Sequence, residues 1–221
     1  MLAAILYDLD GTIVNTDPLH YQVWRGMLQE YKIEIDEDFY KNHMSGRLNP
    51  QIVRDFMPEW STAAIYEFSD RKEARFREVA GTLKSLPGLD DVIKWGSDRT
   101  LKQGLVTNAP RANAEYMLEV LQLSTAFDRV VISAEVGIPK PDPAPYEHIL
   151  KEFGITPGEA LAFEDSPSGM RSAVAAGIKT VGIATTQEPS ELYELGAALV
   201  ISDYTDSRLW ELLGVPKQLQ S

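Results

Sequence analysis

Two carboxylates stand two residues apart near the start of the chain. Asp8 and Asp10 follow the apolar run 1–7, which is typical of a buried strand, and Gly11 permits a sharp turn after them. Side chains two apart on a strand point to the same side, and open α/β sheets bind ligands beyond the carboxyl ends of their strands. Taken alone, however, the motif fits an exposed Asp-Gly turn almost as well.

Polar or charged groups also follow three later predicted strands: Thr107 with Asn108, Lys140, and Glu164 with Asp165. If these groups meet Asp8 and Asp10 at one edge of a sheet, the carboxylates repel one another unless positive charge lies among them. A divalent cation supplies that charge. Ligands that are all oxygen, in a chain without cysteine, favour Mg²⁺, which commonly shares its coordination shell with a substrate phosphate. Thr107, Lys140 and backbone donors can hold such a phosphate.

The elements that must position these residues form an α/β pattern from about Gly88 onward. The apolar runs are mostly continuous, as in strands covered on both faces of a parallel sheet. We predict strands at residues 103–107, 129–133, 160–164, 179–183 and 197–201. We predict one helix that begins after Asp142, which caps its N-terminus, and that carries Tyr146 in its apolar stripe. A second helix should extend from Ser166 to Gly177. The predicted fold is a doubly wound, mostly parallel α/β sheet.

The segment from residue 15 to 86 carries no strand signal. Its pattern predicts successive helices at 20–31, 36–42, 51–56 and 62–79. Because this segment separates the first strand from the rest of the α/β pattern, we expect an inserted all-helical cap domain. The expected boundaries are 15–86 for the cap, and 1–14 with 87–221 for the α/β core.

Composition excludes several classes of protein. The 221 residues are 44% hydrophobic and 24% charged, as in an ordinary soluble globular protein. The net charge of −12 argues against nucleic acid or an anionic membrane as a partner, and the absence of cysteine excludes thiolate chemistry. The opening apolar run is too short for a signal peptide, and no run approaches the roughly 18 residues of a membrane helix. We therefore expect a cytoplasmic monomer.

Four motifs, Asp8-Leu-Asp10-Gly-Thr12, Thr107-Asn108, Lys140-Pro and Glu164-Asp165-Ser, resemble in order and spacing those of the haloacid dehalogenase-like superfamily. The resemblance covers nearly the whole chain. The helical insert directly after the first motif resembles the cap of the first subclass of that superfamily. The resemblance implies a Rossmann-like core and a hydrolase that acts on a small phosphorylated metabolite.

The resemblance also implies roles for the acidic residues. Asp8 is the nucleophile that forms an aspartyl-phosphate, and Asp10 is the general acid that protonates the leaving oxygen and the base that activates water. Mg²⁺ is held by the Asp8 carboxylate, the Asp10 backbone carbonyl and Asp165. Glu164 is a further ligand or an anchor for the others.

The implied phosphate-binding residues are Asp8, Gly11, Thr107, Asn108 and Lys140. Thr107 and Lys140 also belong with the catalytic residues, because they hold the transferring phosphoryl group. Taken separately, Thr107 fits the start of a turn, and Lys140 fits an exposed loop charge between two prolines. Their joint agreement with the motif set favours the functional interpretation.

The cap carries a second set of resemblances. The stretch 18–24 resembles the first cap helix of sugar-phosphate phosphatases and β-phosphoglucomutases, which implies that His20 and Trp24 face the substrate, although packing also explains a histidine on an amphipathic helix. Gly46 and Arg47 resemble the cap loop that touches substrate in the same relatives. Arg71-Lys72 resembles a basic pair of the last cap helix, but a solvated helix face explains those charges equally well.

Three alternative activities fit parts of the sequence. The β-phosphoglucomutases that the cap resembles carry a lysine a few residues beyond the basic pair 71–72, and the stretch 73–78 has none. This difference favours hydrolysis, but phosphoryl transfer of the mutase type stays open. Dehalogenation is disfavoured by Asp10 and the acidic pair 164–165, because dehalogenases of the superfamily need neither Mg²⁺ nor a second aspartate. A phospho-aspartate signalling module without turnover also combines clustered acids, a threonine and a lysine, but such receivers are about half as long and lack the helical insert.

Overall fold

The computed structural model describes residues 1–215, and the chain divides into two compact units. One unit comprises residues 1–15 together with the chain from residue 84 onward, and the other comprises residues 16–83. The first is an α/β sheet unit, and the second is the helical insert. Each unit is described below by itself.

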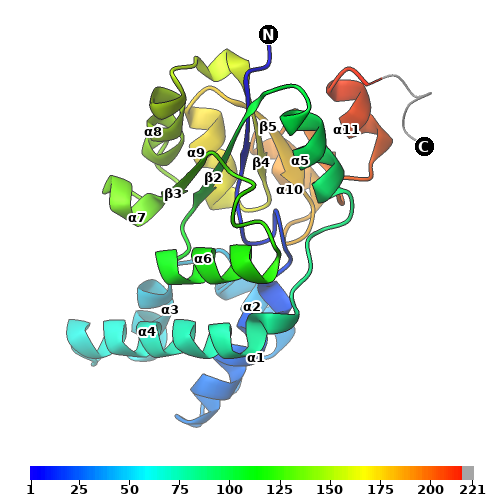
Figure 1. The fold of residues 1–221 in the computed structure, drawn as a ribbon. Coiled ribbons are helices and arrows are strands. Elements are labelled where there is room, and N and C mark those ends of the chain that lie inside the picture. The colour runs from blue at the N-terminus through cyan, green and yellow to red at the C-terminus, as the bar shows by residue number, and fades with distance from the viewer. Residues whose placement is uncertain (216–221) are drawn as a thin grey trace. The chain divides into compact units, whose positions relative to one another are not determined.

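The α/β unit is built on one sheet of six strands in the order β3-β2-β1-β4-β5-β6, and every neighbouring pair is parallel. The strands are β1 Ala4–Tyr7, β2 Lys102–Thr107, β3 Arg129–Ile132, β4 Ala160–Glu164, β5 Lys179–Ile183 and β6 Leu199–Ile201. Helices flank the sheet on both sides, with α8 and α9 on one side and α5 and α11 on the other in Figure 1. The predicted doubly wound parallel fold is therefore confirmed.

The strand order reverses at the centre of the sheet. β1 pairs with β2 on one side and with β4 on the other, so the chain winds outward in both directions from β1. Ligands of open α/β sheets bind beyond the carboxyl ends of the strands at such a switch point. Asp8 directly follows β1, Thr107 and Glu164 are the last residues of β2 and β4, and Asn108 and Asp165 come directly after them. The topology therefore gathers the predicted site residues at one edge.

The helices of this unit are α5 Leu89–Ser97, α6 Arg111–Val120, α7 Ser133–Val136, α8 Ala144–Phe153, α9 Pro167–Ala175, α10 Pro189–Glu194 and α11 Ser207–Leu212, with a 3-10 turn at Pro157–Glu159. Ser166 caps α9, as its Oγ accepts a hydrogen bond from Gly169 N at 3.1 Å. The Asp142 carboxylate accepts from Ala144 N at 2.9 Å, but the residue before α8 is Pro143. The helix thus begins two residues after the predicted cap.

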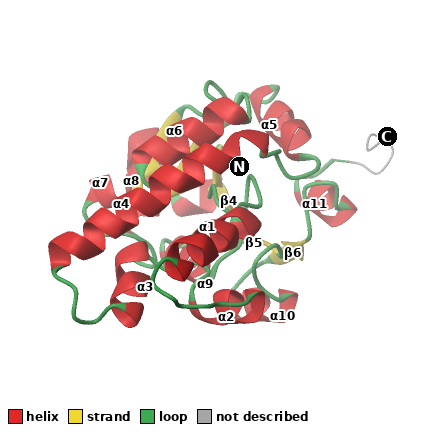
Figure 2. Ribbon diagram, turned by 90° about the horizontal axis from the view of Figure 1, so that it is seen from below, coloured by secondary structure: helices red, strands yellow, loops and turns green. Residues whose placement is uncertain are grey.

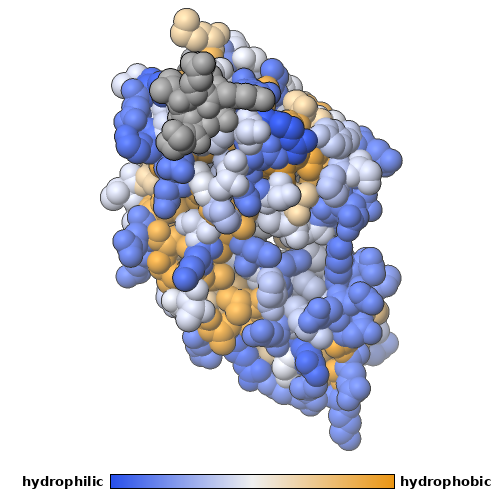
Figure 3. Space-filling model, turned by 90° about the vertical axis from the view of Figure 1, so that its right-hand side faces the viewer, coloured by the Kyte–Doolittle hydropathy of each residue, from blue (hydrophilic) through white to orange (hydrophobic). Residues whose placement is uncertain are grey.

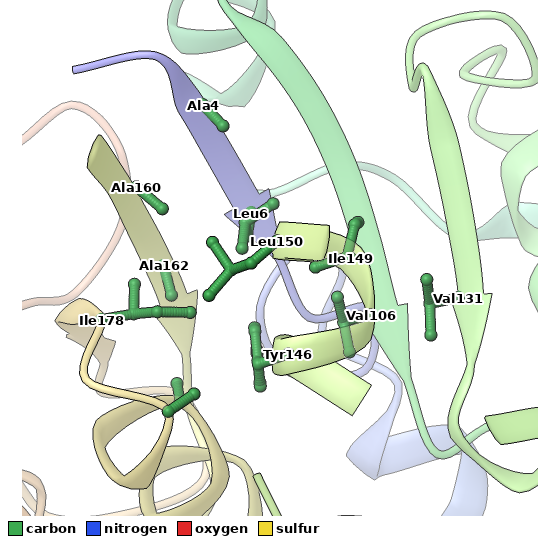
Figure 4. Packing of buried hydrophobic residues seen from close by; sticks show 12 residues of the cluster. Ala4, Leu6, Val106, Val131, Tyr146, Ile149, Leu150, Ala160, Ala162 and Ile178 are labelled. Carbon is green, nitrogen blue, oxygen red and sulfur yellow. The ribbon is translucent and has the colours of Figure 1, made fainter. Parts of the chain in front are cut away.

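The core beneath α8 is apolar and closely packed. Tyr146 and Leu150 of α8 lie against Leu6, Val106 and Ala162, which come from the three central strands (Figure 4). All of these side chains are at most 4% exposed. Burial of a leucine or valine side chain contributes roughly 1.5–3 kcal/mol relative to exposure, so this packing holds α8 against the central strands.

The helical insert consists of α1 Asp17–Gln29, α2 Glu37–His43, α3 Asn49–Phe56 and α4 Thr62–Val79, followed by a 3-10 turn at Ala80–Thr82. The long helix α4 packs on both α1 and α3 (Figure 2). Asp36 caps α2 by accepting from Phe39 N at 2.7 Å, and Ser61 caps α4. The predicted helix at 62–79 has the observed bounds.

The face of the molecule drawn in Figure 3 is mostly hydrophilic, with hydrophobic residues gathered in smaller areas. Across residues 1–215, none of the helices combines the length and the hydrophobicity that crossing a membrane requires.

Candidate active site

Three buried carboxylates come together at the carboxyl ends of β1 and β4. Tyr7 pairs with Phe163 in the sheet, and Asp8 N donates to Phe163 O at 3.0 Å, which places Asp8 beside Glu164 and Asp165. One oxygen from each of the three carboxylates lies within 4.8 Å of the others. Like charges this close repel strongly in a buried site, so the arrangement needs a positive partner.

Lys140 supplies part of that positive charge. Its Nζ donates to Asp8 Oδ1 at 2.8 Å, to Glu164 Oε1 at 2.6 Å and to Val106 O at 2.7 Å. Burial lowers the pKa of Lys140, but Asp8 and Glu164 outweigh it, so the pKa lies above its ordinary value. The side chain is 3% exposed, and the interpretation of Lys140 as an exposed loop charge is therefore wrong.

The charge balance of the site leaves room for a cation. Burial raises the pKa of Asp8 to about 7, the negative charges of Glu164 and Asp10 raise it too, and Lys140 opposes them. One ammonium faces three carboxylates, and Oε2 of Glu164 is buried without a hydrogen-bond partner among the described residues. A hard divalent cation prefers oxygen ligands of this kind. The residues therefore fit a divalent metal site.

The Asp165 carboxylate is held from two sides. Thr12 Oγ1 donates to Asp165 Oδ1 at 3.4 Å, and Thr186 Oγ1 donates to Asp165 Oδ2 at 2.6 Å. Gly11 has φ +79°, and a Cβ at this position would overlap the Asp165 carboxylate. Thr186 was not among the predicted site residues, although it closely follows the predicted strand 179–183, and a polar residue at a strand end is the signal that could have found it.

Thr107 and Asn108 lie at the end of β2. Thr107 is 1% exposed, and its Oγ1 accepts from Ala109 N at 2.9 Å. The Asn108 side chain donates to Lys140 O at 3.2 Å and accepts from Lys140 N at 3.1 Å. This reciprocal pair fastens the backbone of the loop that carries Lys140, a contact that the sequence did not predict.

Tyr146 also reaches the site. Its hydroxyl donates to Glu164 Oε1 at 2.6 Å from the first turn of α8. Burial and the neighbouring carboxylates raise the pKa of Tyr146 well above its ordinary value, so the hydroxyl keeps its proton and acts as a donor. The sequence predicted only that this ring packs in the apolar stripe of its helix.

The helical insert contains a buried lysine, Lys72. Lys72 is 2% exposed, and its Nζ lies 2.7 Å from His20 Nδ1 and 3.0 Å from Glu73 Oε1. The rings of Trp24 and Phe76 each lie 5.7 Å from the same ammonium. The interpretation of Lys72 as part of a solvated helix face is therefore wrong. Trp24 is itself 2% exposed, and His20 stacks on Phe76 with ring centroids 4.2 Å apart.

Gly46 and Arg47 lie in the loop between α2 and α3. Gly46 has φ +73°, which suits glycine, and Arg47 N donates to Met44 O at 3.1 Å. The Arg47 guanidinium donates to Asp55 Oδ2 and to His43 O, both at 2.7 Å, and its side chain is 39% exposed. The guanidinium is thus anchored within the insert while part of it stays accessible.

Replacing Glu73 by glutamine should destabilise the protein by about 3–5 kcal/mol at neutral pH, because the buried Lys72 ammonium loses its carboxylate. Burial raises the pKa of Glu73, but Lys72 and a hydrogen bond from Asn49 lower it by more, so the pKa lies below its ordinary value of 4.5. A lowered pKa stabilises the folded state above the ordinary pKa, and this stabilisation is lost as pH falls through the folded value. The difference between wild type and variant should therefore shrink in acid.

Urea unfolding between pH 7 and pH 3.5 measures this difference. The exposed Glu67 on the same helix provides the control, since Glu67→Gln should change stability by less than about 0.5 kcal/mol. Equal stability of Glu73→Gln and wild type at pH 7 would show that the Lys72–Glu73 pair contributes nothing net.

Comparisons with known proteins agree with the observed fold. Residues 5–183 match the family model of the haloacid dehalogenase-like hydrolases. The chain is 28% identical to a phosphorylated carbohydrates phosphatase of Thermotoga maritima, covering 90% of this chain and 94% of that protein. It is 24% identical to the β-phosphoglucomutase of Bacillus subtilis, covering 96% and 94%.

A solved structure shows the same fold. The family IA haloacid dehalogenase hydrolase of Entamoeba histolytica superposes with a TM-score of 0.86 at 23% identity, covering 99% of this chain and 97% of that one. The family model spans β1 to β5, and therefore all the strands whose ends carry the acidic cluster. The chain belongs to the haloacid dehalogenase-like hydrolase family.

Proposed function

We propose that this chain is a Mg²⁺-dependent phosphatase that hydrolyses a small phosphorylated metabolite, a phosphosugar or a similar organic phosphate, through an aspartyl-phosphate. One observation supports it above the others: Asp8, Glu164 and Asp165 converge in a buried site, and Lys140 contacts the first two. Membership of the hydrolase family and the similarity to a phosphorylated carbohydrates phosphatase support the phosphoric monoester hydrolase class.

Asp8 is the nucleophile in this mechanism. Its carboxylate oxygen attacks phosphorus, a phosphorus–oxygen bond forms, and the ester oxygen leaves with a proton from Asp10. Asp10 then takes a proton from water, which attacks the aspartyl-phosphate and releases inorganic phosphate with Asp8 restored. The raised pKa of Asp8 in the metal-free site means that this carboxyl must lose its proton before it can attack.

The other residues bind and orient. Lys140 holds one Asp8 oxygen at 2.8 Å, which aims the carboxylate and offsets its repulsion with the incoming phosphate. Thr107 and backbone donors near Gly11 bind the phosphoryl oxygens, and Asn108 keeps Lys140 in place through its backbone. Asp8, the Asp10 carbonyl, Glu164 and Asp165 would hold Mg²⁺, which would supply further positive charge for the phosphate.

The helical insert serves as the substrate-binding cap in this proposal. His20, Trp24, Gly46 and Arg47 select the substrate, and residues 15–86 form the cap while 1–14 and 87–221 form the core. The enzyme acts in the cytoplasm as a monomer. Its partners include neither nucleic acid nor a membrane, and the net charge of −12 supports the exclusion of both.

A panel of phosphorylated metabolites tests this function. Purified protein with Mg²⁺ should release phosphate repeatedly from at least one phosphosugar, and chelation should stop the release. The panel should include β-glucose 1-phosphate, because formation of glucose 6-phosphate would instead indicate a mutase, the activity named for the Bacillus subtilis relative. Labelling of the protein that stops at one phosphoryl group per chain, without turnover, would indicate a signalling module.

A further inference from the structure

Tyr146 and Lys140 share a single oxygen atom of Glu164. The Tyr146 hydroxyl and the Lys140 ammonium each lie 2.6 Å from Glu164 Oε1. Both donors are buried, Tyr146 completely and Lys140 to 4% exposure. The Lys140 ammonium also lies 5.1 Å from the centre of the Tyr146 ring. The tyrosine therefore contacts both members of the Lys140–Glu164 ion pair.

Lys140 has no donor to spare. An ammonium group offers three N–H donors, and the three acceptors of Lys140 are Asp8 Oδ1, Val106 O and Glu164 Oε1. Only one of its donors therefore reaches Glu164. The second hydrogen bond to Oε1 comes from Tyr146. A single hydrogen bond would leave the Glu164 carboxylate able to rotate, and the second bond restricts that rotation.

Gly169 bounds the same carboxylate from another side. A Cβ at Gly169 would overlap the whole Glu164 carboxylate, so α9 approaches this group as closely as a residue without a side chain allows. Oε2, the oxygen that neither Tyr146 nor Lys140 binds, is buried and has no hydrogen-bond partner within residues 1–215. The Glu164 carboxylate is thus held with Oε1 hydrogen-bonded twice and Oε2 without a hydrogen bond from the described residues.

We propose that Tyr146 is a positioning residue for the metal site: its hydroxyl holds Glu164 Oε1, so that Oε2 is presented to the cation and Lys140 keeps its bond to Asp8. The inference rests on the proposed function, which requires a divalent cation at this cluster. Hydrogen-bond partners of metal-binding carboxylates orient them, and their loss typically costs about 10–100-fold in metal affinity.

Calorimetric titration of the full chain with Mg²⁺, without substrate, tests this role. Tyr146→Phe keeps the ring over Lys140 and removes only the hydroxyl, and it should raise the Kd for Mg²⁺ by about 10–100-fold. The Mg²⁺ concentration for half-maximal hydrolysis should rise in parallel, with a smaller change in kcat at saturating metal. A tyrosine that only packed would change thermal stability and leave the Kd unchanged.

Tyr7→Phe is the matched control. Tyr7 is fully buried in β1, and its hydroxyl donates to Gln103 Oε1 at 3.2 Å, so the variant loses the same atom from an equally buried place. Tyr7→Phe should lower stability to a similar degree and leave the Kd for Mg²⁺ within about twofold of wild type.

Gly169→Ala displaces the same carboxylate independently. Alanine favours helix formation over glycine by about 1 kcal/mol, but its Cβ must push Glu164 aside, so Mg²⁺ affinity should fall here too. Gly26→Ala in α1 is its control, because a Cβ at Gly26 meets nothing within 4 Å and Mg²⁺ binding should stay unchanged. Should Tyr146→Phe fail to fold, Gly169→Ala decides whether the position of Glu164 sets metal affinity.

Wild-type Mg²⁺ affinity in folded Tyr146→Phe would overturn the inference and leave the phosphatase proposal intact. Wild-type affinity in Gly169→Ala, with Tyr146→Phe unfolded, would overturn it as well. If the wild-type chain binds no Mg²⁺, both the inference and the metal requirement of the proposed function are wrong. If Mg²⁺ binding depends on Tyr146 but no phosphate ester is hydrolysed, the positioning role stands and the proposed function does not.

Discussion

Replacing Asp8 by asparagine should abolish phosphate release from the best substrate, with a fall in kcat on the order of 10⁴-fold or more. An amide oxygen does not attack phosphorus, so the aspartyl-phosphate cannot form. The variant should stay folded, because the amide still accepts from Lys140, whose ammonium also keeps its bond to Glu164. Steady-state phosphate release, with circular dichroism on the same samples, measures both effects.

The pH dependence of stability provides an independent check on this variant. The pKa of Asp8 in the folded, metal-free protein is raised to about 7 from 3.8. A raised pKa means that the folded state holds a proton that the unfolded chain releases, so wild type loses stability as pH rises between these values. Asp8→Asn has no proton to lose at this position. In the absence of metal, its free energy of unfolding should therefore rise relative to that of wild type from pH 4 to pH 7.

Asp98→Asn serves as the control for activity, because Asp98 is an exposed aspartate that pairs with Lys94 at the surface. Its kcat should match wild type. Phosphate release by Asp8→Asn within tenfold of wild type would show that another group is the nucleophile.

The fold could be predicted because local patterns and long-range packing agree. Continuous apolar runs marked the strands, and the helical pattern of residues 62–79 marked α4. The errors lie at boundaries. Ser133 was assigned to a strand, but β3 ends at Ile132 and Ser133 begins α7. β6 begins at Leu199, two residues later than expected, because hydrophobicity alone does not show where pairing with β5 starts.

The site was predicted as a set of strand ends, and what could not be predicted is which atoms meet. Lys140 finds acceptors 132, 34 and 24 residues away in the sequence, and nothing near it in the chain indicates burial. Hydrophobic periodicity assigns a whole side chain to one environment. It therefore placed Tyr146 in the core correctly and could not show that the hydroxyl reaches Glu164 on β4.

The same limit explains Lys72. Lysine is among the residue types least often buried, so a prediction made from single residue types places Lys72 at the surface. In the structure, a carboxylate and an imidazole meet the ammonium while two aromatic rings cover it. Burial of a charge depends on partners that a helical pattern does not contain.

Replacing Lys140 by methionine should lower kcat by about 10²–10³-fold and, in metal-free buffer at pH 8, destabilise the fold by about 3–5 kcal/mol. Methionine matches the length and apolar contacts of the lysine stem but leaves Asp8 and Glu164 without the ammonium that contacts both. Initial rates at saturating Mg²⁺ measure the first effect, and urea unfolding measures the second.

The sign of the pH effect distinguishes lost charge from lost packing. Without Lys140, its ammonium no longer opposes the burial and the negative charge of Glu164 that raise the pKa of Asp8, so this pKa rises further. A group with a raised folded-state pKa favours the folded state at low pH and disfavours it as pH rises. The destabilisation of Lys140→Met should therefore be largest at pH 8 and shrink toward pH 4. Mg²⁺ should restore stability at pH 8, because it binds the folded state and neutralises the same carboxylates.

Lys151→Met, on the exposed end of α8, is the matched control and should change stability by less than about 0.5 kcal/mol at any of these pH values. A loss of stability in Lys140→Met that is the same at pH 4 and pH 8, and that Mg²⁺ does not relieve, would mean that the lysine stabilises the fold through its stem alone. In that case the acidic cluster would not need a positive charge at this position, and the charge balance proposed for the site would be wrong.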